Sequence, residues 1–234
     1  MSLPHFFIDN FGTSKTITLP EETSKHCIQV LRMKEGEWLQ LTDGKGNLIK
    51  TRIINPDRKN CTVIIEGKEF IHSNTKQISV AISLLKNSNR FEWFLEKATE
   101  IGVSEIIPLL CHRTERQHFR FERMNNILVA AMLQSEQSWL PTLHEPKSFD
   151  KIVSSSHYSQ KLIACCEDDG NRNNISAVSS SNEMQILIGP EGDFTKDEIE
   201  LALKYNYHPV SLGETRLRSE TAGVVAAGLL MNIG

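Results

Sequence analysis

Two segments of the chain place glycines and charged side chains directly after an apolar run. The first is Ile188-Gly189-Pro190-Glu191-Gly192-Asp193-Phe194. Its glycines allow the backbone to approach a ligand closely, and Pro190 stiffens the turn and removes one N–H donor. The spacing is neither G-x-x-x-x-G-K-[ST] nor G-x-G-x-x-G, so nucleoside triphosphates and dinucleotides are poorly supported. The segment is either a ligand-binding loop or a glycine turn that only joins a strand to a helix.

The second segment is Leu212-Gly213-Glu214-Thr215-Arg216-Leu217-Arg218-Ser219-Glu220, followed by an almost wholly apolar stretch. Two arginines and a glutamate stand here at the start of an expected buried helix. Burying such charges is costly unless they have partners. An arginine–glutamate pair that caps the helix explains them, and so does a polar site at the end of a sheet.

The pattern from residue 77 onward predicts alternating strands and helices that position these two loops. Strands are expected at 78–85, 105–110, 161–166, 185–188 and 209–212, and helices at 89–101, 124–133 and 219–231. Thr195 and Glu198 form a capping-box pattern that opens another helix. Asn89 and Gly102 are the expected caps of the first helix, while 140–158 and 168–182 are expected to be surface loops. Alternation of this kind indicates a parallel sheet covered on both faces, and ligands of such sheets bind beyond the carboxyl ends of the strands.

The first 70 or so residues have a different pattern, typical of a small β-barrel. Branched and aromatic residues predict strands at 38–42, 49–54 and 61–65, with a turn at 43–47. Pro20, Glu21 and Glu22 suit the first turn of one interrupting helix.

Composition excludes several classes of protein. With 234 residues, 39% hydrophobic and 24% charged, the chain is expected to fold around a real core. It has neither a stretch of roughly 20 apolar residues, as a membrane span needs, nor the order of a signal peptide, so a cytoplasmic protein is expected. Five cysteines without a C-x-x-C spacing predict buried thiols rather than disulfides or a metal site. Residues 1–127 carry 18 basic against 15 acidic residues, so a contact with nucleic acid is expected there.

The two loop motifs together carry a resemblance to a known family. Ile-Gly-Pro-Glu-Gly at 188–192 and Leu-Gly-x-x-x-Leu-Arg-x-Glu-Thr at 212–221 resemble the small-subunit ribosomal RNA uridine-N3 methyltransferases, the RsmE family of the SPOUT class. The likeness extends over nearly the whole chain. The further matching segments are His26-x-x-x-Val30-Leu31-Arg32-Met33, the stretch Arg90 to Val103, Gln134-Ser135 and Leu140-Pro141.

The resemblance implies a PUA-like β-barrel RNA-binding domain at 1–72 and an α/β methyltransferase domain with a trefoil knot at 73–234. It implies S-adenosylmethionine as cofactor, S-adenosylhomocysteine as product, ribosomal RNA of the small subunit as partner, and a homodimer without metal or membrane. Carried over, the cofactor site consists of Ile163, Ala164, Ile188, Gly189, Pro190, Glu191, Gly192, Leu212, Gly213, Leu217 and Arg218. The chain departs from the family pattern at Asp193, where a third glycine is frequent, and at Thr215 and Gln137, where arginines are common.

Methylation at N3 requires loss of the N3 proton and alignment of the base with the methyl group. We expect Arg218 to hold a uracil carbonyl oxygen, Glu220 to orient Arg218 or relay the proton, and Glu191 to be the rival base. Arg32, Lys86, Arg90 and Arg113 are candidates for phosphate contacts. For each of these four, a solvated surface charge is the alternative, or a helix-start ion pair for Arg90.

Two other classes of function compete with this interpretation. An RNA-binding module that has lost the donor site would lack the Gly189 and Gly213 loops, which are intact here. A Rossmann-type enzyme would need a glycine fingerprint after the first strand, and residues 83–89 contain no glycine. Within the class, another base or another RNA stays open.

Overall fold

The computed structural model describes residues 3–115, 117–165 and 173–233. The chain forms two compact units. The first comprises residues 1–73 and 132–140, and the second comprises 74–131 and 141–234. The segment 132–140, which the sequence assigns to the second domain, therefore groups with the first unit. Across the described residues, no helix is long and apolar enough to cross a membrane.

The first unit is built on a five-stranded sheet in the order β1-β3-β4-β5-β2. Only the β1–β3 pairing is parallel. The inward residues of these strands, among them Leu39, Leu41 and Ile53, form a closed apolar core. The predicted strands are confirmed, although β5 starts one residue later and continues further. The strand bounds are His5–Phe7 (β1), Thr16–Thr18 (β2), Trp38–Thr42 (β3), Asn47–Asn55 (β4) and Thr62–Phe70 (β5).

The predicted helix in this unit is short and changes its winding. Helix α1 covers Glu21–Lys25 and continues as a π-helix, His26–Val30. The turn at 43–47 is confirmed, because the Asp43 carboxylate accepts hydrogen bonds from the Lys45 and Asn47 backbone N–H groups at 2.8 and 3.3 Å. Such self-bonded Asp residues are typical of tight turns.

The second unit contains an eight-stranded sheet in the order β11-β13-β10-β12-β6-β7-β8, with β9 paired to β7. Every pairing in it is parallel. The carboxyl ends of all these strands therefore lie at one edge. The bounds are Gln77–Ser83 (β6), Glu105–Leu110 (β7), Thr142–Leu143 (β8), Lys147–Ser148 (β9), Gln160–Ala164 (β10), Asn173–Asn174 (β11), Glu183–Ile188 (β12) and His208–Ser211 (β13).

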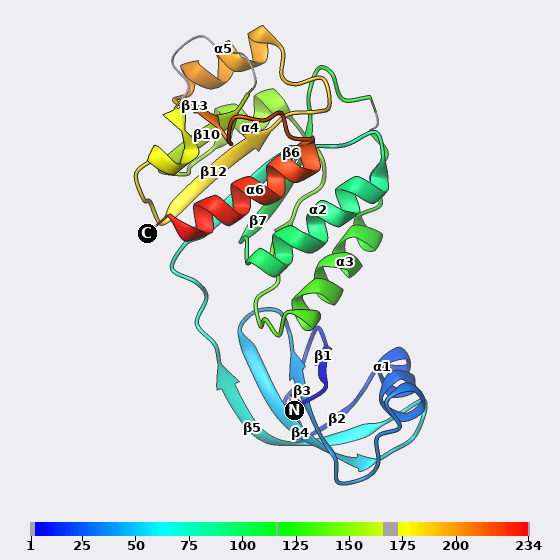
Figure 1. The fold of residues 1–234 in the computed structure, drawn as a ribbon. Coiled ribbons are helices and arrows are strands. Elements are labelled where there is room, and N and C mark those ends of the chain that lie inside the picture. The colour runs from blue at the N-terminus through cyan, green and yellow to red at the C-terminus, as the bar shows by residue number, and fades with distance from the viewer. Residues whose placement is uncertain (1–2, 116, 166–172, 234) are drawn as a thin grey trace. The chain divides into compact units, whose positions relative to one another are not determined.

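Helices cover both faces of this sheet (Figure 1). Helices α2 and α6 lie together on one face. They pack so tightly that a Cβ on Gly223 of α6 would meet the Phe94 ring of α2 at 2.6 Å. Helices α4 and α5 enclose the core on the other face, around Phe149, Phe194 and Tyr207. The helices span Ser88–Ile101 (α2), Phe121–Gln134 (α3), Phe149–Ser155 (α4), Lys196–Lys204 (α5) and Ser219–Asn232 (α6).

Two local predictions in the second unit were wrong. Asn87, not Asn89, caps α2, because its side chain accepts the backbone N–H of Asn89. The stretch 140–158 is not a loop, since it forms β8, β9 and α4. Phe149 of α4 is a buried apolar side chain, but the polar residues around it made the helix hard to predict. The stretch 168–182 includes β11 and the 3₁₀ turn Ile175–Ala177, and its residues 168–172 lie outside the described part. Gly102 and the Thr195–Glu198 capping box are confirmed as predicted.

Candidate active site

The two glycine-bearing loops meet because their strands are near neighbours in the sheet. Strand β10 pairs with β12 on one side and β13 on the other, with Ala164 opposite both Ile188 and Val210. The segments that follow these strands enclose one cavity of about 580 Å³. It is lined by Arg90, Ala164, Cys165, Ile188, Gly189, Pro190, Glu191, Asp193, Val210, Ser211, Leu212, Gly213, Glu214, Thr215, Arg216, Leu217, Arg218, Ser219 and Ala222.

The loop after β12 turns sharply through Asp193. Its backbone N–H donates to the Pro190 carbonyl at 2.9 Å, and its φ of 62° lies in the left-handed region. Glycine adopts this conformation freely and Asp tolerates it, which explains why Asp193 can stand where the resembling family often has glycine. A Cβ on Gly189 would meet the Phe194 ring and backbone nitrogen at 3.2 Å. Bare backbone at Gly189 therefore keeps this turn closed against the buried Phe194.

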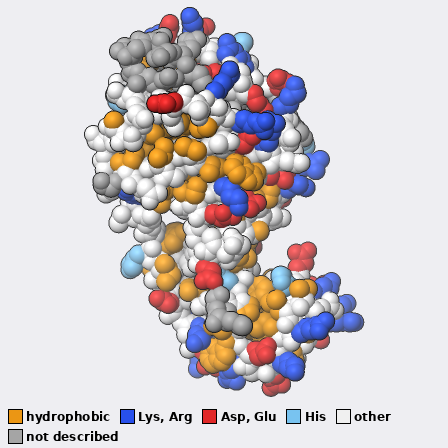
Figure 2. All heavy atoms as spheres, viewed as in Figure 1, with side chains coloured by type: hydrophobic (Ala, Val, Ile, Leu, Met, Phe, Trp, Pro, Cys, Tyr) orange, Lys and Arg blue, Asp and Glu red, His pale blue; other side chains and the backbone are white. Residues whose placement is uncertain are grey.

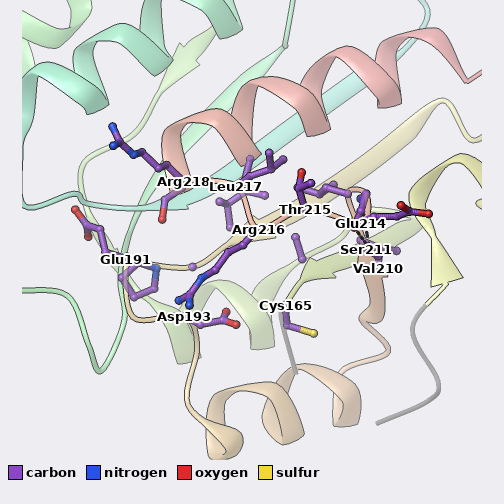
Figure 3. Close-up of a pocket in the computed structure, with 18 of the residues that line it drawn as sticks. Cys165, Glu191, Asp193, Val210, Ser211, Glu214, Thr215, Arg216, Leu217 and Arg218 are labelled. Carbon is purple, nitrogen blue, oxygen red and sulfur yellow. Dashed lines mark hydrogen bonds between the residues drawn. The ribbon is translucent and has the colours of Figure 1, made fainter. Parts of the chain in front are cut away.

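The loop after β13 depends on a second glycine. Gly213 has a φ of 141°, and a Cβ there would meet no atom of the described residues within 4 Å. The Ser211 hydroxyl donates to its carbonyl at 2.8 Å and accepts from its N–H at 3.3 Å. In the view of Figure 3, Arg216 points toward Asp193 and Arg218 points the other way. The two arginines thus serve different parts of the cavity wall.

Helices α2 and α6 bring a charged pair to the same place. The Nε of Arg90 lies 3.6 Å from Oε1 of Glu220, whose side chain is only 8% exposed. The Oε2 atom of Glu220 is buried and has no hydrogen-bond partner within the described part of the chain. Arg90 lines the cavity and Glu220 does not. The pair is the helix-start ion pair that the sequence left as one alternative for Arg90.

The other candidate RNA-binding cations differ in their surroundings. Arg113 donates to the Gly192 and Phe194 carbonyls at 2.5 and 3.3 Å, so it braces the loop after β12. Lys86 lies 2.8 Å from a carboxylate oxygen of Glu115, whose hydrogen bond and charge raise the pKa of this exposed amine. The Lys86 backbone N–H donates to Glu191 at 3.0 Å. Arg32 is exposed on the first unit with a φ of 57°.

Most of the residues expected around a cofactor line the cavity, but not all of them. Ile163 is fully buried in the core behind it, and Gly192 lies outside its wall. Cys165 and Ser211 line it although the sequence did not single them out as site residues, and Arg216, one of the two arginines of the second segment, lines it as well. They stand next to predicted residues along the chain, so wider windows around each strand end would have included them.

The cysteines in the described part of the chain are buried. These are Cys27, Cys61, Cys111 and Cys165, as predicted, while Cys166 lies outside the described residues. Burial, with a smaller contribution from the Glu198 charge, raises the pKa of Cys111 to about 12, so its thiol stays protonated at neutral pH. Among the described residues, no group of three or more His, Cys, Asp or Glu side chains could hold a metal ion.

The cavity fits a nucleoside-sized cofactor. Its volume lies within the roughly 300–1,000 Å³ typical of small-molecule sites. The wall mixes aliphatic side chains with a few charged ones. Gly189 and Gly213 stand in it, one from each loop.

Comparison with known proteins agrees with this geometry. The profile of an RNA methyltransferase domain matches residues 72–231, and that of an RNA methyltransferase PUA domain matches residues 19–66. A Synechocystis protein named ribosomal RNA small subunit methyltransferase E is 30% identical over 217 residues, which cover 90% of this chain and 71% of the relative. The Bacillus subtilis protein of that name is 27% identical, covering 90% and 88%. The chain belongs to this family of RNA methyltransferases.

Solved structures give the same result. A Porphyromonas gingivalis protein described as a probable rRNA methyltransferase is 36% identical, with a TM-score of 0.91 over 99% of this chain and 98% of its own. A candidate methyltransferase from Legionella pneumophila, described with the cofactor SAM bound, is 26% identical with a TM-score of 0.87, covering 98% and 97%.

Proposed function

We propose that this protein transfers a methyl group from S-adenosylmethionine to N3 of a uridine in small-subunit ribosomal RNA, releasing S-adenosylhomocysteine. The single observation that carries the proposal is that the loops after β12 and β13 line one cavity of cofactor size. Membership in the family supports the reaction class. The Legionella structure, described as holding SAM, supports the donor.

The donor site consists of the strand ends and glycine loops. Backbone groups from 188–191 and 212–218 would bind the polar parts of the cofactor, with Ala164 and Leu217 against its apolar parts. When bound, the cofactor supplies an electrophilic methyl group on a sulfonium. The chain's own contribution is to hold the donor rigidly and exclude water around that methyl group, which is an orientation task.

Arg218 is the residue we assign to the acceptor base. It lines the cavity at the N-terminus of α6, where the positive end of the helix dipole adds to its charge. The Arg218 charge and the helix dipole both stabilise the negative charge that develops on a uracil carbonyl oxygen as the N3 proton leaves. Glu191, a carboxylate on the cavity wall, is assigned to accept that proton. Glu220 is assigned to hold Arg90, because it contacts Arg90 and lies outside the wall.

Three broader features belong to the same proposal. Residues 1–72 form an RNA-binding PUA-like domain. The α/β domain carries the SPOUT knot, and the strand order supports this topology, because β10 lies between β12 and β13, which both follow it in the chain. Apolar side chains gather along α6 on the face shown in Figure 2, which favours burial of that helix against a second copy of the chain. Since ribosomal RNA is the substrate, the enzyme acts where ribosomal subunits are made, in the cytoplasm.

The test is methylation of small ribosomal subunits that lack this modification, followed by mass spectrometry of the RNA nucleosides. Wild-type protein should produce N3-methyluridine. Arg218→Ala should lower the turnover number by about 100-fold or more, as expected when one donor to a developing oxyanion is removed, while Arg58→Ala, an exposed arginine of the first unit, should leave turnover unchanged. A different methylated nucleoside would overturn the choice of base, and undiminished turnover in Arg218→Ala would overturn its role.

A further inference from the structure

An exposed tryptophan stands among cations on the sheet of the first unit. Trp38 is 37% exposed. The Lys50 ammonium lies 4.7 Å from the centre of its ring, and the Arg52 guanidinium carbon lies 6.0 Å from it. We call these three residues the Trp38 platform. None of them belongs to the cavity of the second unit.

The strand register shows that the platform faces solvent. Trp38 is directly opposite Arg52, and Lys50 is opposite Gln40, the next residue of β3 on that face. Alternation along the strands sends the intervening residues, such as Leu39, into the core. Gly67 lies opposite Lys50 on the neighbouring strand, where its missing side chain leaves the sheet surface bare beside the lysine.

The two cations of the platform differ, because Arg52 has a carboxylate partner and, among the described residues, Lys50 has none. Arg52 is fixed by Glu66, whose Oε1 accepts from both Nε and Nη2 at 3.0 and 2.8 Å. Lys50 has no carboxylate partner within ion-pair distance among the described residues. The platform therefore combines a partly exposed aromatic ring, a fixed guanidinium, and an ammonium that lies over the ring and has no carboxylate partner among the described residues.

Such a combination suits a nucleotide with an unpaired base. Every base has a π-face that can stack on an aromatic side chain, and neighbouring cations can neutralise the phosphates. A double helix hides its base faces, so it would gain only the charge contacts.

We propose that the Trp38 platform binds a single-stranded nucleotide of the RNA substrate, with the base stacked on Trp38 in place of the Lys50 ammonium, which turns from the ring to hold a phosphate. The ligand class rests on the proposed function, which makes RNA the partner of this chain. The platform adds a site to the four cations expected from the sequence, and it lies on a sheet face that none of the sequence motifs indicated.

The test measures by fluorescence anisotropy how tightly the full-length protein binds a fluorescein-labelled oligouridine. An oligouridine of about 12 nucleotides is long enough to cover one site of this kind. Trp38→Ala should weaken binding by about 5- to 150-fold, the loss that corresponds to about 1–3 kcal/mol per stacked base. Trp38→Phe, which keeps an aromatic face, should bind within about threefold of the wild type. Lys50→Gln should reduce the slope of affinity against salt by about one ion.

Two matched controls isolate the platform. Phe70 is an exposed aromatic residue at the end of β5, away from the platform cations, and Lys59 is an exposed lysine in a loop of the same unit. Phe70→Ala and Lys59→Gln should leave oligouridine binding unchanged. Circular dichroism of each variant verifies folding.

Two results would overturn the platform: wild-type protein that does not bind oligouridine, or Trp38→Ala that binds as tightly as wild type. Equal losses in Trp38→Phe and Trp38→Ala would also contradict stacking, and preference for an oligouridine–oligoadenosine duplex would indicate charge contacts alone. Methylation of ribosomal subunits by the same wild-type preparation separates the two proposals. If methylation proceeds while the platform variants bind normally, the platform fails and the enzymatic function stands.

Discussion

The two ends of the eight-stranded sheet contrast sharply. At the carboxyl end, loops with glycines enclose an open cavity whose charged side chains lie on its wall. At the amino end, polar side chains from several strands fill the space and hydrogen-bond to one another. Glu105, at the start of β7, is the centre of this amino-end network.

The amino-end network satisfies its members with one another. Glu105 accepts from the Tyr158 hydroxyl at 2.8 Å and from His144 Nε2 at 2.7 Å. Lys147 lies 3.2 Å from the other ring nitrogen of His144, so that nitrogen accepts and Nε2 carries the proton toward Glu105. Two further hydrogen bonds lie beside it. The Tyr207 hydroxyl donates to Gln185 Oε1 at 2.6 Å, and Gln185 Nε2 donates to the Ser79 hydroxyl at 3.1 Å.

The difference teaches that titratable side chains alone do not make a site. The amino end has a glutamate, a histidine and a tyrosine in contact, but their hydrogen bonds are taken up by each other. Such networks stabilise a fold when fully satisfied. The carboxyl end instead encloses a cavity of about 580 Å³ with two glycines in its wall, which is the space that a ligand requires.

The largest effect is expected from Gly189→Val at the carboxyl end. A Cβ there already meets the Phe194 backbone at 3.2 Å, and overpacking of this kind costs about 1–3 kcal/mol. S-adenosylmethionine affinity, measured by isothermal titration, should fall by up to about 100-fold. Gly67→Val, on a strand of the first unit, is the control and should bind the donor normally. Equal affinity in both variants would contradict the role of the first glycine loop.

The next effect concerns the amino end. Glu105→Gln should lower the free energy of unfolding by about 2 kcal/mol, because hydrogen bonds to a charged group contribute about 1.5–3 kcal/mol. Donor affinity should not change. Urea unfolding measures the free energy of unfolding, and isothermal titration measures donor affinity. The control is Glu96→Gln, which removes a half-exposed surface ion pair and should cost less than about 1 kcal/mol of stability. A loss of donor binding in Glu105→Gln would mean that the two ends are not independent.

The smallest expected effect is the pH dependence of that loss. Burial raises the pKa of Glu105, but hydrogen bonds from Ser79, Tyr158 and His144 outweigh burial and leave the pKa below its ordinary value of 4.5. A depressed pKa in the folded state contributes stability above the unfolded pKa, and this stability is lost as the pH falls through the folded pKa. The difference in unfolding free energy between wild type and Glu105→Gln should be constant from pH 7 to about 5 and should shrink at lower pH. A difference that grows on acidification would contradict this sign.

The sequence predicted the five longer strands of the sheet, because most of these buried parallel strands are continuous apolar runs, but it missed the two-residue strands β8, β9 and β11. It also predicted that the loops after β12 and β13 would meet, since parallel strands share one carboxyl edge. It did not predict α4, where Phe149, Ile152 and Val153 are buried within a polar stretch. Periodicity is weak over so short a helix.

Contacts between distant segments were beyond sequence reasoning. The Arg90–Glu220 pair joins α2 to α6, and Arg113 reaches the loop after β12. Both depend on tertiary packing rather than on spacing along the chain. The Trp38 platform was missed for a related reason, because its three residues come together only through the register of β3 and β4.

Hydrogen exchange measured with and without S-adenosylmethionine tests most directly whether the two glycine loops form the donor site. At saturating donor, the backbone amides of 188–194 and 211–218 should exchange more slowly, while peptides that cover Glu105 and Tyr158 should be unchanged. Protection of only one loop, or protection centred on the amino end of the sheet, would contradict the account.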